Sequence, residues 1–175
     1  MNNLIQGSMD ILGQGENLLG SISDKEYCNI IRPWFISSIG EHTRHLLDHY
    51  LAIRNGVASG CIDYDIRSRG SEIQTDKQAA LELIKSIKQW LPLLSQDDLN
   101  TTLQCRTEVA VKQTLCSSAG TTLARELIFA ASHAVHHYAV MAIAAQMQQV
   151  EVERGFGLAP ATATFLRDSG APCAP

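Results

Sequence analysis

Ala130-Ala-Ser-His133-Ala-Val-His136-His137-Tyr138-Ala-Val-Met141 is the stretch of sequence that decides the fold. It lies inside a segment, residues 121–149, in which apolar residues recur at helical spacing and neither proline nor glycine occurs. This pattern predicts one long, largely buried helix. Three histidines on such a helix need an explanation, because a polar group is costly to bury without a partner.

The six histidines of the chain fall into two groups. His133 and His137 are four positions apart, which places both imidazoles on one side of a helix, where they can converge on a single ion. His42, His45 and His49 also follow helical spacing in an earlier segment. The sequence therefore predicts two histidine-bearing helix faces.

Two interpretations of these faces remain open. A single histidine on an apolar face is most often a core residue that is satisfied by a hydrogen bond. A pair that faces a second group is typical of a metal site inside a helical bundle, since neutral imidazole is a common metal ligand. Three neutral imidazoles would leave coordination positions open on zinc or nickel, as catalytic sites do. The clustering favours the metal.

Length and composition exclude several classes of protein. The chain has 175 residues, which suits one domain, and a net charge of -4 with 18% charged residues, so no basic surface for nucleic acid or anionic lipid is expected. The N-terminus lacks the pattern of a secretory signal, and the apolar histidine segment is interpreted as a core helix rather than a membrane span. Five cysteines without a Cys-x-x-Cys motif make a thiolate site improbable. We expect a cytoplasmic protein with a small-molecule substrate.

Apolar periodicity predicts the remaining helices. Pro33 is expected to open the second helix. Thr75, with Gln78 three positions later, is expected to cap the third. The predicted helices cover residues 4–22, 33–57, 75–90, 121–149 and, as a short final element, 160–167. Four long helices with short connections indicate an antiparallel bundle.

Two other segments do not follow helical spacing. Residues 101–108 and 109–116 alternate and are rich in β-branched side chains, which predicts a short β-hairpin between the third and fourth helices. Residues 61–72 are polar and are predicted to form a loop between helices. The alternative is a lid in which Arg67 or Arg69 binds an anionic ligand or cofactor.

The arrangement of the histidines resembles the DinB/YfiT-like superfamily. In that family, one histidine of the second helix and a His-x-x-x-His pair of the last long helix bind a divalent metal. His45 matches the single ligand, and His133 and His137 match the pair. The resemblance implies an all-α four-helix bundle of DinB-like type, a single domain over residues 1–170 and a frayed tail over residues 171–175.

The same resemblance implies a function. Family members with assigned activities are thiol-dependent transferases and isomerases, so the leading expectation is a metal-dependent transferase with zinc or nickel and a low-molecular-weight thiol cofactor. His49 and His136 are then candidates for proton carriers or for partners of the ligands. A metal-dependent hydrolase is one alternative. The other is a non-catalytic, homodimeric metal-binding or stress-response bundle, and a homodimer is expected in either case.

Overall fold

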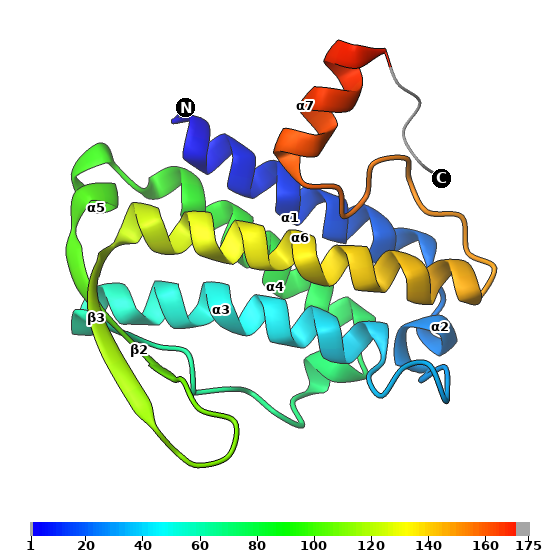
Figure 1. Cartoon of the computed structure of the whole chain (residues 1–175), viewed down its shortest axis with the longest axis horizontal. Coiled ribbons are helices and arrows are strands. Elements are labelled where there is room, and N and C mark those ends of the chain that lie inside the picture. The colour runs from blue at the N-terminus through cyan, green and yellow to red at the C-terminus, as the bar shows by residue number, and fades with distance from the viewer. Residues whose placement is uncertain (1, 171–175) are drawn as a thin grey trace.

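The computed structural model describes residues 2–170, so the predicted tail at residues 171–175 lies outside the described part. Within that part the chain is 62% helical and carries a small three-stranded mixed sheet (Figure 1). The four long helices are α1 (Asn3–Ser21), α3 (Ile39–Ser59), α4 (Lys77–Trp90) and α6 (Leu123–Met147). The shorter helices are α2 (Asp24–Cys28), α5 (Gln96–Asn100) and α7 (Pro160–Ser169), together with 3-10 turns at Glu72–Gln74 and Leu91–Leu93.

The four long helices pack around one hydrophobic core. α1 and α3 each contact both α4 and α6, which closes a ring of four helices. Tyr50 of α3 and Tyr138 of α6 are among the largest fully buried side chains of this core. Burying a large apolar side chain contributes about 1.5 to 3 kcal/mol. The pairing of α3 with α6 matters most for function, because it brings the two predicted histidine faces together.

Two of the predicted helix starts are wrong. Pro33 lies in a turn, and α3 begins six residues later, where the Ser38 hydroxyl and the Glu41 side chain form a reciprocal capping box. At α4 the cap is Asp76 rather than Thr75, because the Asp76 carboxylate accepts hydrogen bonds from the first free backbone N–H groups. In both cases a better side-chain acceptor lies near the expected cap.

The sheet has the strand order β1-β2-β3. The hairpin of β2 (Thr102–Glu108) and β3 (Cys116–Thr122) confirms that the segment turns back on itself, but the expected second strand, residues 109–116, is mostly its connection. Residues 117–122 pair with β2, and Thr122 at the end of β3 also caps α6. Polar serines and threonines are tolerated in β3 because most of the strand is solvent-exposed.

The first strand was not predicted. β1 (Cys61–Asp63) pairs in parallel with β2, inside the segment that was expected to be a loop. Gly60 ends α3 with φ of 75°, a left-handed conformation that glycine adopts without strain. At Gly56 a Cβ would lie 2.6 Å from the Cγ1 of Ile62, so the absent side chain lets β1 lie against α3. The sheet therefore covers the end of α3 near the histidines.

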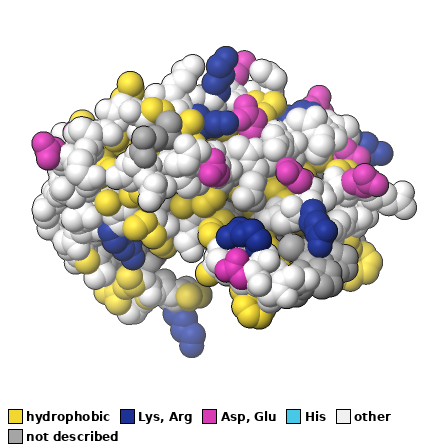
Figure 2. Space-filling view, turned by 90° about the horizontal axis from the view of Figure 1, so that it is seen from above, with side chains coloured by type: hydrophobic (Ala, Val, Ile, Leu, Met, Phe, Trp, Pro, Cys, Tyr) yellow, Lys and Arg dark blue, Asp and Glu magenta, His cyan; other side chains and the backbone are white. Residues whose placement is uncertain are grey.

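By length and hydropathy α6 would suffice to cross a membrane, yet half of its apolar window is buried within the protein. This burial agrees with its interpretation as a core helix. Figure 2 shows that Lys and Arg side chains are interspersed with Asp and Glu on the face seen from above, and that no histidine is visible there. The histidines of α3 instead lie with His133 and His137 of α6 between these two helices.

Candidate metal centre

Three imidazoles meet between α3 and α6. The Nε2 atom of His133 lies 3.1 Å from the Nε2 atom of His45 and 3.1 Å from the Nε2 atom of His137. His133 and His137 are one turn apart on α6, and His45 faces them from α3, as the spacing predicts. Two nitrogens bound to one metal at 2.0 to 2.1 Å, at angles between square and tetrahedral, lie about 2.8 to 3.4 Å apart. Both observed distances fall within that range.

His49 belongs to the same cluster. His45, His49 and His133 offer nitrogen atoms that all lie within 4.8 Å of one another, so this partly buried group can hold a metal ion. His49 donates its Nδ1 proton to the backbone carbonyl of His45 at 3.0 Å. The neutral ring therefore keeps an unprotonated Nε2 atom, which is the form that binds a metal.

His42 supports the cluster from outside. Its Nδ1 atom lies 2.9 Å from the Nδ1 atom of His137, and one of the two carries the shared proton. When His137 donates, its Nε2 atom keeps a free lone pair directed at His133. This contact fixes the orientation of the His137 ring in the way that outer partners orient metal-binding histidines.

The environment keeps these imidazoles neutral. Burial removes them from water and lowers the pKa of His45 and His137 to about 3 and that of His133 to about 4. Repulsion from neighbouring histidines adds to this effect, and the Arg67 charge also lowers the pKa of His45 and His133. The rings are consequently available as ligands over a wide range of pH.

The remaining predicted site residues lie in different places. His136 is exposed on α6, with its ring centroid 6.4 Å from that of His133, so it lies at the edge of the cluster. Arg67 lines a cavity next to His49, whereas Arg69 does not line it. The sequence could not separate the two arginines, because both lie in one polar segment without periodicity.

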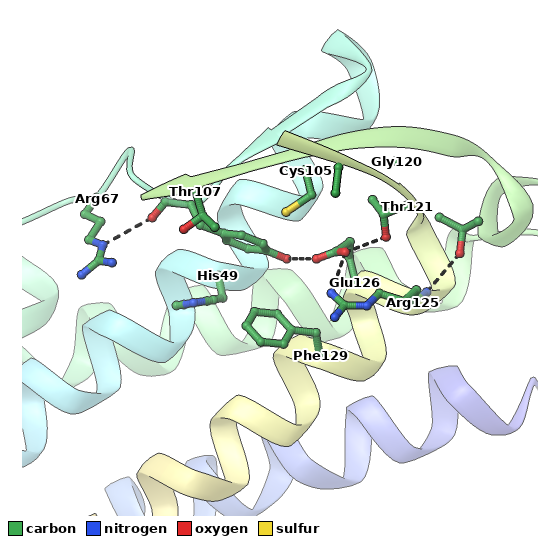
Figure 3. A pocket seen from close by; sticks show the side chains of 12 residues that line it. His49, Arg67, Cys105, Thr107, Gly120, Thr121, Arg125, Glu126 and Phe129 are labelled. Carbon is green, nitrogen blue, oxygen red and sulfur yellow. Dashed lines mark hydrogen bonds and ion pairs between the residues drawn. The ribbon is translucent and has the colours of Figure 1, made fainter. Parts of the chain in front are cut away.

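This cavity has a volume of about 620 Å³ and lies between the sheet, α3 and the first turns of α6. Figure 3 shows Arg67 and Arg125 at its two ends, with Cys105 and Thr107 on the sheet side and His49 and Phe129 on the helix side. The volume falls in the range of small-molecule sites. It therefore places a ligand-sized space beside the histidine cluster.

A second polar cluster lies in the cavity wall and was not predicted from the sequence. Glu126 is fully buried and accepts hydrogen bonds from Tyr64 Oη at 2.6 Å, Thr121 Oγ1 at 2.6 Å and Arg125 Nη1 at 2.8 Å. Burial by itself raises the pKa of this carboxyl, but the three hydrogen bonds outweigh it and lower the pKa below the usual value. An acidic residue inside the apolar first turn of α6 was the available signal.

Comparisons with known proteins leave the family open. No protein-family model and no solved structure matches the chain. A segment of 107 residues, 61% of this chain, is 30% identical to FK506-binding protein 5 of Rhizopus delemar. That segment spans 28% of the fungal protein, so the likeness concerns little more than a quarter of it.

Proposed function

We propose that the protein binds one divalent metal ion between α3 and α6, with His45, His133 and His137 as ligands. The observation that carries this proposal is the position of His133 Nε2, 3.1 Å from two other Nε2 atoms. A ring nitrogen has either one proton to donate or one lone pair to accept with. It can therefore make only one good hydrogen bond of this kind, whereas one cation satisfies all three lone pairs.

His49 is the rival for the third position. It belongs to the group with His45 and His133, and its Nε2 atom is unprotonated because Nδ1 donates to a backbone carbonyl. His137, in turn, places its Nε2 atom 3.1 Å from that of His133, and His42 orients its ring through Nδ1. We assign His137 as the ligand and His49, which lines the adjacent cavity, to the substrate side of the site.

We further propose that the four long helices form a bundle of the DinB/YfiT type. The proposal is supported by the closed ring of α1, α3, α4 and α6 and by the ligand arrangement, in which one histidine of α3 faces a His-x-x-x-His pair of α6. The three-stranded sheet is an addition at one end of this ring. It supplies a wall of the cavity that a bare bundle would lack.

The activity that this site supports best is transfer of a group to a small thiol. A zinc or nickel ion with three imidazole ligands keeps a position open and, when bound, lowers the pKa of a coordinated thiol or water. The chain supplies the other requirements: neutral ligands, a largely apolar cavity beside them, and His49, which belongs to the histidine cluster and lines the cavity. On the sheet side the stacked rings of His49 and Tyr64 form part of the cavity wall.

The test is an assay of zinc-loaded and nickel-loaded protein. Glutathione, cysteine and dithiothreitol would each be offered with 1-chloro-2,4-dinitrobenzene, and p-nitrophenyl acetate would be offered without a thiol. We expect metal-dependent thiol consumption that His133→Ala removes and His136→Ala, one exposed position on the same helix, retains. Metal-dependent ester cleavage without thiol transfer would instead assign the site to a hydrolase.

The choice of the third ligand has its own test. Metal affinity would be measured for His137→Ala and His49→Ala by competition with a coloured chelator. We expect the larger loss for His137→Ala. A larger loss for His49→Ala would transfer the third position to His49 while leaving the metal site in place.

A further inference from the structure

The cavity beside the histidines has a mostly apolar wall, and two arginines, Arg67 and Arg125, line it. Tyr64 stacks on His49 with ring centroids 4.9 Å apart, and Phe129 lies 5.6 Å from Tyr64 and 5.8 Å from His49. All three rings line the cavity, and those of His49 and Phe129 also lie 4.1 and 5.8 Å from the ring of His133. Such a surface is suited to the flat apolar body of a small ligand.

Arg67 lies in a loop that hydrogen bonds fix at the end of this surface. Its Nε atom donates to the backbone carbonyl of Tyr64 at 3.3 Å, and the next backbone N–H, that of Ser68, donates to Asp48 Oδ2 at 3.2 Å. Tyr64 is itself fixed by its hydrogen bond to Glu126. The loop is thus tied to α3 on one side of Arg67 and to α6 on the other.

A buried ion pair serves this loop. Asp48 is 5% exposed and pairs with Arg44, 9% exposed, one turn earlier on α3 at 2.5 Å. Burying such a pair has a desolvation cost that the mutual attraction often does not exceed. Its structural use here is the second contact of Asp48, from the Ser68 N–H, which ties the loop to α3.

The two arginines of the cavity differ in whether a carboxylate compensates their charge. Arg125 pairs with Glu126 at 2.8 Å and lies over the Phe129 ring at 5.3 Å, so its charge is compensated. Arg67 forms no ion pair with any carboxylate in residues 2–170. The cavity therefore has one uncompensated positive charge, at the end where the histidines lie.

We propose that the substrate is a small organic acid whose carboxylate pairs with Arg67 and whose apolar body lies along Tyr64 and Phe129. A guanidinium group matches a carboxylate with two parallel hydrogen bonds. A single uncompensated cation suits a monoanion, and the buried negative charge of Glu126 at the far end disfavours a more highly charged ligand. This inference rests on the proposed function, because the acid is taken to be the substrate of the metal centre.

The test is calorimetric titration at low ionic strength with benzoate, phenylacetate and hexanoate, and with benzamide as an uncharged control of the same shape as benzoate. Arg67→Ala would be compared with the matched variant Arg69→Ala, two residues away and outside the cavity. We expect at least one acid to bind the wild type, and Arg67→Ala to weaken it by about tenfold or more, the effect of losing a charged hydrogen bond. Arg69→Ala should change the affinity by less than about twofold, since Arg69 does not line the cavity.

Three results would overturn the inference: no acid binds the wild type, benzamide binds as well as benzoate, or the two arginine variants weaken binding equally. Each titration would be made on metal-free and on zinc-loaded protein, with the metal content measured separately. Failure to bind zinc would overturn the proposed function alone. Acid binding to metal-free protein that depends on Arg67 would still support the anion site.

Discussion

Two polar clusters lie on the same helix and are built in opposite ways. The carboxylate of Glu126, in the first turn of α6, accepts hydrogen bonds from three donors. Groups of the chain itself therefore stabilise its charge. Two turns later, the Nε2 atom of His133 lies 3.1 Å from the Nε2 atoms of both His45 and His137, and one ring nitrogen cannot satisfy both contacts. The difference teaches that a closed cluster stabilises a fold, whereas an incomplete one indicates a missing ligand.

The largest effect is expected from removing the central ligand. His133→Ala should weaken binding of zinc by more than about a hundredfold, since even outer partners of metal ligands account for about ten- to a hundredfold. Competition with a coloured chelator measures this affinity. His136→Ala is the matched control, because His136 is exposed on the same helix. Equal affinities of the two variants would remove His133 from the site.

Glu126→Gln should disrupt the hydrogen-bonded cluster around residue 126 and leave the histidine cluster unchanged. The substitution removes the negative charge to which three donors are hydrogen-bonded. Hydrogen bonds to charged groups contribute about 1.5 to 3 kcal/mol. We expect the free energy of unfolding to fall by about 2 kcal/mol in urea titrations, while the folded variant keeps its metal affinity. Thr122→Ser, which retains the cap of α6, provides the control. A loss of metal with unchanged stability would contradict the division between the clusters.

The two clusters also differ in how well the sequence predicted them. His45, His133 and His137 could be placed because helical spacing fixes which residues share a face, and the packing of α3 on α6 brings these faces together. Glu126 could not, since its donors Tyr64 and Thr121 come from a loop and a strand whose positions depend on β1. A strand of three residues leaves no period in the sequence. The long helices were predicted because their apolar periodicity is visible in the sequence, whereas β1 is too short to have one.

A smaller effect is expected at the outer histidine. His42→Ala should lower the zinc affinity by about tenfold, because His137 loses the Nδ1 partner that fixes its ring. His42→Asn, which can keep a polar contact to His137, should recover part of the loss. The affinities would be measured by the same chelator competition. If His42→Ala binds zinc as the wild type does, the contact between the two Nδ1 atoms has no part in holding the metal.

The last prediction concerns the pH dependence of stability. The buried histidines have lowered pKa values, about 3 for His45 and His137 and about 4 for His133, against 6.5 when unfolded. Between these values the unfolded chain binds more protons, so the stability of metal-free protein should be constant above about pH 6.5 and decline as the pH falls toward 4. Urea unfolding at several pH values in the presence of a chelator measures this. Replacing His45, His133 and His137 together by Phe should flatten the profile, and an unchanged profile would contradict the assignment.

The most direct test of the central claim is the metal content of untagged protein by inductively coupled plasma mass spectrometry. The protein would be reconstituted with zinc or nickel and then passed through a desalting column, beside the double variant His133→Ala/His137→Ala. The account predicts close to one metal ion per chain in the wild type and essentially none in the double variant. Wild-type protein without bound metal, or a double variant that retains as much as the wild type, would contradict it.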